Sequence, residues 1–380
     1  MTTKPIETLL AELIAIDSVN PELEAGGAGE AAMAQHCAEF LRASGFEVDV
    51  IEVAPGRPNV IARHGTGSPT LLFNGHLDTV GVAGMSVPPL EPRVSGGRMF
   101  GRGSCDMKGG LAALLDAGRR LANSGHDGTL MVALTCDEEH ASIGMAHLIE
   151  SGIQADAAVV CEPTELAVMP AHKGFVWMEA RFRGRAAHGS RPDEGIDAVR
   201  HAAVFLASLD ELEARLTSPP PHPLLGHGSL HVGTIAGGTA ASVYPDSCTI
   251  VLERRTLPGE NTARVVEEFA QQISEVATRV PGLDATLTCT LARPGTEVDP
   301  SHRLVAGLCR ALNAQGIPGR IEGMTAWVDA AYLNESGIPA VCFGPGSITR
   351  AHTADESVEL DQVVACAEVL EHFGREFLTL

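Results

Sequence analysis

The chain has 380 residues, a length that predicts two domains or one domain with a large insertion. Hydrophobic residues make up 44% and charged residues 20%, which excludes a disordered chain and favours a globular protein with a buried core. The 27 Lys and Arg against 48 Asp and Glu leave a net charge of −21, which argues against nucleic acid and anionic membranes as partners but not against metal ions.

The N-terminal segment MTTKPIETLLAELIAI predicts an amphipathic helix rather than a signal peptide. It carries acidic residues inside an apolar run and has no small-residue cleavage site. No stretch reaches the apolar length that a membrane span requires. The nine cysteines are scattered and include no CxxC pair, which is typical of free thiols in a reducing compartment. We therefore expect a cytoplasmic protein.

Strands and helices alternate in the first part of the chain. Helical spacing of the apolar residues within 9–14 predicts a first helix, and a second is predicted at about 29–43. Predicted strands follow at FEVDVIEV, NVIAR and TLLFNGH, and the Gly-rich MFGRGSCDMKGG leads into the predicted helix LAALLDAGRRLA. Strand TLMVALTCDEE, helix SIGMAHLIE and strand AAVVCEP complete the pattern. It predicts an α/β sheet with mostly parallel strands, whose ligands bind at the C-terminal strand ends.

The pattern changes at about residue 173. Strands are predicted at WMEARFRG, SLHVGTI, CTIVLERR and DATLTCTL, with helices at GIDAVRHAAVFLASL and about 261–278. Their order, βαββαβ, is that of a ferredoxin-like domain. Helix and strand alternation then resumes with HRLVAGLCRALNAQ and PAVCFGPG. We predict a discontinuous α/β domain of residues 1–172 and 293–380 with an inserted domain of residues 173–292.

Five short segments place carboxylates or histidines after strand-like runs: LLFNGHLDTV, GRGSCDMKGG, LTCDEE, VVCEPTE and AHTADE. Their candidate residues are His76, Asp78, Asp106, Glu138, Glu139, Glu162 and His352. Singly, such residues are more often structural, solvated or helix-capping. Together they are predicted to meet, because all five segments are expected where strands of one sheet end. Imidazole and carboxylate without a thiolate cluster are typical ligands of Zn²⁺.

Local patterns refine this prediction. Period-two alternation in HLD puts His76 and Asp78 on one side of a strand, so the carboxylate can hold the second imidazole nitrogen. Asp106 follows a Gly-rich turn that allows close approach of the backbone. That turn could instead belong to a nucleotide loop, but it lacks the GxxxxGK[ST] and GxGxxG orders. Cys105 and Cys136 are interpreted as small packing residues rather than metal ligands.

In this order, HLDTV, GRGSCDMKGG, TCDEE, CEPTE and AHTADE resemble the metallopeptidase family that includes acetylornithine deacetylase, succinyl-diaminopimelate desuccinylase and glutamate carboxypeptidases. The resemblance covers essentially the whole chain. It implies two Zn²⁺ ions per chain, with Co²⁺ as a substitute. One would be held by His76, Asp106 and Glu162, and the other by Asp106, Glu139 and His352.

The resemblance also implies the reaction. Asp78 matches the carboxylate that orients His76, and Glu138 matches the general base that takes a proton from the attacking water. The implied activity is hydrolysis of an amide bond in an N-acyl amino acid, as in acetylornithine deacetylase. Alternatives are a carboxypeptidase or dipeptidase that releases a C-terminal amino acid, and succinyl-diaminopimelate desuccinylase. A non-catalytic binding protein is a remote alternative.

The inserted domain resembles the family's lid and dimerisation domain, which implies a homodimer. His188 matches a histidine that in relatives reaches the active site of the partner subunit and stabilises the oxyanion. The alternative is that His188 caps the following helix, although capping preferences favour Ser190 or Asp193 there.

Further residues are implied to bind the substrate. Arg255 in LERRTLPGE matches an arginine that grips a substrate carboxylate. Its alternatives are the neighbouring Arg254, on the opposite strand face, and a plain surface ion pair. Asp329 in MTAWVDAAYL matches a stretch that shapes the substrate pocket. The chain departs from the family in GGTAASVYPD, where Ser242 stands in place of an asparagine that relatives often have.

Overall fold

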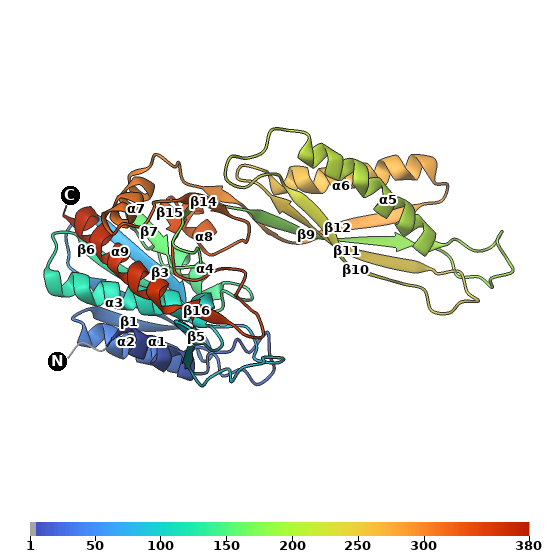
Figure 1. The fold of residues 1–380 in the computed structure, drawn as a ribbon. Helices are drawn as coiled ribbons and strands as arrows, with labels where there is room; N and C mark the ends of the chain where they lie inside the picture. The colour runs from blue at the N-terminus through green and yellow to red at the C-terminus, as the bar shows by residue number, and fades with distance from the viewer. Residues whose placement is uncertain (1–4, 380) are drawn as a thin grey trace. The chain divides into compact units, whose positions relative to one another are not determined.

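The computed structural model describes residues 5–379, and this part of the chain forms two compact units (Figure 1). The larger unit contains the chain up to Pro170, Val298–Glu322 and the chain from Val328 on. The smaller unit consists of Ala171–Glu297 and Gly323–Trp327. Residues 1–4, with which the predicted N-terminal helical segment begins, lie outside the described residues.

The larger unit is built on a mixed sheet. Its strand order begins with β1 (Glu47–Ala54), β2 (Arg57–His64), β6 (Thr129–Thr135), β3 (Thr70–His76), β7 (Ala157–Val160), β15 (Ala340–Cys342) and β8 (Val168–His172). Parallel pairing joins β6, β3, β7 and β15 at the centre, while β1 and β2 continue the sheet beyond β6 in antiparallel pairing. The central strands are short apolar runs buried on both faces, as parallel strands generally are. The predicted α/β class is confirmed.

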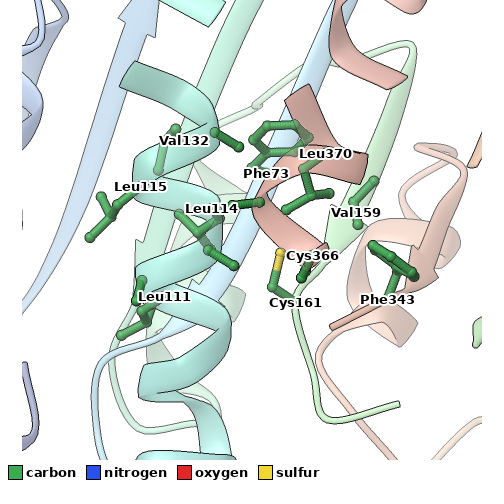
Figure 2. Close-up of a cluster of buried hydrophobic side chains, with 14 of the residues drawn as sticks. Phe73, Leu111, Leu114, Leu115, Val132, Val159, Cys161, Phe343, Cys366 and Leu370 are labelled. Carbon is green, nitrogen blue, oxygen red and sulfur yellow. The ribbon is translucent and has the colours of Figure 1, made fainter. Parts of the chain in front are cut away.

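Helices accompany this sheet in the larger unit: α1 (Ile6–Ala15), α2 (Ala31–Ala43), α3 (Gly109–Ser124), α4 (Ile143–Glu150), α7 (Arg303–Ala314), α8 (Ala330–Glu335) and α9 (Leu360–Leu378). Figure 2 shows Leu114 of α3 and Leu370 of α9 beside Phe73 of β3, all fully buried in the main core. Within residues 5–379, no helix is both long and apolar enough to cross a membrane.

Gly110 sets how closely α3 approaches the sheet. A Cβ atom at this position would lie 2.1 Å from the carbonyl oxygen of Cys161, just after β7. Only glycine lets the helix backbone come this near, and the helix N-terminus is thereby held against the ends of the central strands.

The smaller unit has the ferredoxin-like order. It contains β9 (Gly174–Arg183), α5 (Ala198–Thr217), β10 (Ser229–Gly237), β11 (Ser247–Thr256), α6 (Thr262–Arg279) and β12 (Asp284–Arg293). The sheet order is β10-β11-β9-β12, and every pairing is antiparallel. Alternate residues of β9, such as Met178 and Phe182, are buried in a core that also includes Phe205 of α5 and Phe269 of α6. The predicted βαββαβ insertion is confirmed.

A second sheet in the larger unit was not predicted. Its strands β4 (Arg93–Ser95), β5 (Arg98–Phe100) and β16 (Ser357–Glu359) pair in the order β16-β5-β4. Strand β5 precedes the irregular turn Ser104–Lys108, in which Asp106 and Met107 have non-helical backbone angles, and β16 follows the AHTADE segment. This small sheet therefore brings two of the five candidate segments together. The short elements β13 (Thr296–Glu297) and β14 (Ile321–Met324) were also not predicted.

Candidate metal centre

Four predicted site residues lie at or just after the ends of three strands of the main sheet. Glu138 and Glu139 follow β6, His76 is the last residue of β3, and Glu162 follows β7. Asp106 instead belongs to the turn before α3, and His352 lies in the loop between β15 and β16. The expectation that all five segments follow strands of one sheet is therefore correct for three of them and wrong for these two. These two segments are brought together by the small sheet, because β5 precedes the turn that carries Asp106 and β16 follows the loop that carries His352.

Two imidazoles meet around the carboxylate of Asp106. Nε2 of His76 lies 3.1 Å from Oδ1 of Asp106, and Nε2 of His352 lies 3.4 Å from Oδ2. Nε2 of His352 is also 3.1 Å from Oε2 of Glu139. Potential ligand atoms of His76, Asp106 and Glu139 all lie within 4.8 Å of one another. Asp106 thus offers one oxygen to each imidazole, the geometry of a ligand that two cations could share.

The charges of this group are strongly coupled. Burial is the largest single influence on the pKa of Asp106 and raises it, but hydrogen bonds from His352 and His76, together with the charges of both imidazoles, lower it below its ordinary value. Hydrogen bonds to Asp106 and Glu139 raise the pKa of His352 to about 10. The carboxylates of Asp106 and Glu139 therefore stabilise positive charge beside them, and in this structure the protonated imidazole of His352 provides that charge.

Further carboxylates crowd the same place. Burial raises the pKa of Glu162 to about 8, and the charge of Asp106 adds to the shift. Desolvation and the charge of Glu162 raise the pKa of the partly exposed Glu138 well above its ordinary value. Burial raises the pKa of Asp329 to about 7. Oε1 of Glu162 has no hydrogen-bond partner among the described residues. Crowded, desolvated carboxylates bind protons or divalent cations, so the residues fit a metal site.

Asp78 lies beside His76 and also contacts the turn that carries the two glutamates. Nδ1 of His76 lies 3.0 Å from the backbone carbonyl oxygen of Asp78 and 3.6 Å from its carboxylate, so the imidazole N–H donates to the carbonyl. The carboxylate instead accepts the backbone N–H of Glu138 at 3.1 Å and that of Glu139 at 3.2 Å. It also accepts a side-chain N–H of Asn20 at 2.8 Å. Asp78 therefore fixes the backbone from which both glutamates project.

Glu356 was not singled out from the sequence, although it lies in the quoted AHTADE segment. Its buried carboxylate accepts backbone N–H groups of Gly103, Cys105 and Asp106 at 2.9–3.1 Å. It also pairs with buried Arg102 at 2.6 Å. The turn that carries Asp106 is thus held by Glu356, close in sequence to His352. An acidic residue in a loop gives no sequence signal for such burial.

The smaller unit carries His188 and Ser242. His188 is exposed, and its Nδ1 accepts the backbone N–H of Ser190 at 3.2 Å. Asp197 caps α5, so helix capping by His188, Ser190 or Asp193 is wrong. The carbonyl oxygen of Ser242 accepts the N–H of Gly189 at 2.7 Å, which ties the Ser242 loop to the His188 segment.

Arg254 and Arg255 lie on opposite faces of β11, as predicted. Arg254 is buried and pairs with Glu260 at 2.6 Å. Arg255 is half-buried, donates to Glu253 at 2.6 Å and lies over the ring of Phe175 at 5.5 Å. Of the two, Arg255 has the more accessible guanidinium, and its role in substrate binding stays a prediction.

The model of Peptidase family M20/M25/M40 matches residues 72–376. The chain belongs to this family. An acetylornithine deacetylase from Myxococcus xanthus is 31% identical over 390 residues, covering 97% of this chain and 96% of the relative. The crystal structure of an aminopeptidase from Bacillus cereus ATCC 10987 has a TM-score of 0.81 at 22% identity, covering 98% of both chains. A dinuclear metal-binding M20 peptidase from Bacillus subtilis has a TM-score of 0.77 at 15% identity, covering 98% of this chain and 97% of the other.

Family membership decides the reaction class. The predicted resemblance is confirmed, and the M20 chain is a metal-dependent hydrolase of carbon–nitrogen bonds. The buried cysteines agree with their interpretation as packing residues: Cys105 and Cys136 are both fully buried, and burial raises the pKa of both thiols.

Proposed function

We propose that this M20 protein is a dinuclear zinc amidohydrolase that removes the acyl group from an N-acyl amino acid. The observation that carries the proposal is the convergence of His76, His352 and Glu139 on the carboxylate of Asp106. The similarity to acetylornithine deacetylases along nearly the full chain supports this substrate class.

In this proposal one Zn²⁺ is held by His76, Asp106 and Glu162, and the other by Asp106, Glu139 and His352, with Co²⁺ as a substitute. Support comes from the donor set of imidazole and carboxylate and from the unpartnered Glu162 oxygen within residues 5–379. The cations would polarise the scissile carbonyl and lower the pKa of the attacking water.

Glu138 is the proposed general base. It accepts a proton from the attacking water and delivers it to the leaving amine. Burial and the charge of Glu162 raise the pKa of this carboxylate, which makes it a better proton acceptor than a solvated glutamate. Asp78 accepts the backbone N–H of Glu138, so the position from which the Glu138 side chain extends is fixed.

The inserted domain has the proposed role of lid and dimerisation domain, with residues 173–292 inserted into a catalytic domain of residues 1–172 and 293–380. Arg255 grips the carboxylate of the substrate, Asp329 shapes the pocket, and His188 reaches the active site of the partner subunit in a cytoplasmic homodimer. The exposure of His188 and the half-burial of Arg255 support roles toward a ligand or a second copy.

A hydrolysis screen tests the function. The panel contains N-acetyl, N-succinyl and N-formyl amino acids and dipeptides, each beside its C-terminal amide. We expect cleavage of N-acetyl amino acids, loss of activity on chelation and recovery with Zn²⁺ or Co²⁺. The C-terminal amides should be poor substrates, because they lack the carboxylate that Arg255 would bind.

Three outcomes would count against the proposal. Full activity after exhaustive metal removal would exclude the metal chemistry, and one metal per chain by elemental analysis would exclude a dinuclear centre. A metal-replete protein that cleaves nothing on the panel would instead favour the non-catalytic alternative.

A further inference from the structure

Asn20 lies at the base of the candidate centre. It follows α1, is fully buried, and donates its backbone N–H to the carbonyl oxygen of Thr79 at 2.9 Å. Its side-chain nitrogen Nδ2 lies 2.8 Å from Oδ2 of Asp78 and 3.0 Å from Oδ1 of Asp137. One uncharged amide group therefore stands between two buried carboxylates.

The amide of Asn20 has one orientation that satisfies its surroundings. Its Oδ1 accepts the backbone N–H of Glu22 at 3.0 Å. A flipped amide would aim its carbonyl oxygen at the carboxylates of Asp78 and Asp137 and its N–H groups at another N–H donor. Because an amide nitrogen carries two N–H groups, each carboxylate receives one of them.

Asp137 is fixed from its other side by an ion-pair network. Its Oδ1 lies 2.9 Å from Nη2 of Arg57, and Arg57 pairs with Glu30 at 2.5 Å. The backbone N–H of Asp137 donates to Glu30 at 3.1 Å. All of these side chains are buried. Asp137 itself takes a left-handed φ of 66°, so the chain turns at this residue just before Glu138.

Asp78 and Asp137 thus hold the same turn at two places. Asp78 binds the backbone N–H groups of Glu138 and Glu139, and Asp137 begins the turn. The two carboxylates would repel each other if no donor stood between them. The distance between them is set by the side chain of Asn20, which bonds to both.

We propose that Asn20 is a positioning residue, whose amide joins Asp78 to Asp137 and thereby aligns the backbone from which Glu138 and Glu139 reach the reaction. The kinetic consequence rests on the proposed function, but the structural consequence does not. No other residue type of similar size supplies two donors without charge. Aspartate would add a third negative charge, serine has a single O–H, and leucine has no donor.

The test compares Asn20→Asp and Asn20→Leu with matched changes at Asn334. Asn334 of α8 also uses both ends of its amide, donating to the carbonyl oxygen of Ala340 at 3.0 Å and accepting its N–H at 2.9 Å. Asn334→Asp and Asn334→Leu therefore make the same chemical change outside the turn.

The first measurement is hydrogen exchange of the metal-free protein. We expect the backbone amides of Glu138 and Glu139 to exchange at least tenfold faster in both Asn20 variants, because the Asp78 carboxylate is no longer held. Amides of β3 should keep their wild-type rates, and the Asn334 variants should leave the Glu138 and Glu139 amides unchanged.

The second measurement is steady-state kinetics with metal added. We expect kcat to fall about 10- to 100-fold in the Asn20 variants with KM nearly unchanged, since Asn20 aligns Asp78 and the glutamates without touching substrate. The Asn334 variants should keep both constants. A purely structural role for Asn20 would instead lower the free energy of unfolding and leave kcat per folded molecule unchanged.

The outcomes separate the two proposals. Wild-type exchange rates at Glu138 and Glu139 in a folded Asn20 variant would overturn the positioning role, whatever the activity. Accelerated exchange in a protein that hydrolyses nothing would support positioning and reject the proposed function. If Asn20→Leu does not fold, the isosteric Asn20→Asp carries the comparison.

Discussion

Asp137, Glu138 and Glu139 are consecutive, yet each has a different set of partners. Asp137 is buried between Arg57 and Asn20, whereas Glu139 contacts His352. Glu138 faces the charge of Glu162, which helps to raise its pKa. The separation follows from the left-handed backbone at Asp137, which turns the chain between the first carboxylate and the other two. Three adjacent acids are therefore tolerated because Asp137 is paired with Arg57 and Asn20, whereas Glu139 is paired with His352.

Replacing Glu138 tests its role in proton transfer. We expect Glu138→Gln to lower kcat by about 10²–10⁴-fold, because an amide cannot accept the proton. Metal content by elemental analysis should stay at the wild-type value, since Glu138 is not a proposed ligand. The exposed Glu165 provides the control, and Glu165→Gln should keep full activity. A Glu138→Gln enzyme with substantial turnover would remove Glu138 from the base role.

At the residue scale, the sequence predicted the residues that stand in recognisable segments. His76, Asp106 and Glu139 are in mutual reach, as the motif order indicated. Asn20 and Arg57 could not be found this way, because each meets Asp137 across a long stretch of chain. Their burial depends on tertiary packing, and a lone Asn in a loop or a lone Arg at the start of a strand is more often solvated.

At the scale of elements, α3 is positioned by its glycines. Gly110 approaches the carbonyl oxygen of Cys161, while a Cβ at Gly118 would make ordinary contacts with the side chains of Phe46 at 3.5 Å and Val132 at 3.8 Å. The two positions lie in one helix and differ in the space that surrounds them. Substitutions at these two positions therefore test whether the close approach of α3 to the sheet requires glycine at position 110.

We expect Gly110→Ala to lower the free energy of unfolding by about 1–3 kcal/mol, because the methyl group forces the helix away from β7. Gly118→Ala should raise it by roughly 0.5–1 kcal/mol, because alanine loses less backbone entropy in a helix and fits without a clash. Urea denaturation measures both values. Destabilisation of similar size by both changes would show that the close approach at Gly110 is not the cause.

Elements with a clear period were predicted, and very short ones were not. The strands of the small sheet have three residues each, too few for an alternating pattern to appear. This is why Asp106 and His352 were expected at strand ends of the main sheet. Both belong to loops that the small sheet holds together.

At the scale of the whole molecule, each of the two units has its own hydrophobic core, and the proposed metal ligands are not shared between them. Every proposed metal ligand belongs to the larger unit, whose core is separate from that of the smaller unit. The two tryptophans, Trp177 and Trp327, both belong to the smaller unit. Tryptophan fluorescence therefore reports on one unit, while circular dichroism reports on both.

Removing metal should separate these two signals. Because a ligand stabilises the unit that binds it, we expect chelation to lower the thermal midpoint seen by circular dichroism by about 5–10 °C if metal was present at about 100 times its Kd. The fluorescence midpoint should change by less than about 1 °C on the same linkage argument. Equal shifts of both signals would show that the units unfold as one.

The hydrogen bonds between Glu356 and the Asp106 turn can form only late in the synthesis of the chain. On a ribosome, His76, Asp106, Glu139 and Glu162 emerge long before His352 and Glu356. Until the later segment arrives, the Asp106 turn lacks the carboxylate that binds its backbone, and Asp106 lacks its second imidazole. A nascent chain thus exposes a partial set of metal ligands without the residues that complete it, and hydrolysis must await the synthesis of β16.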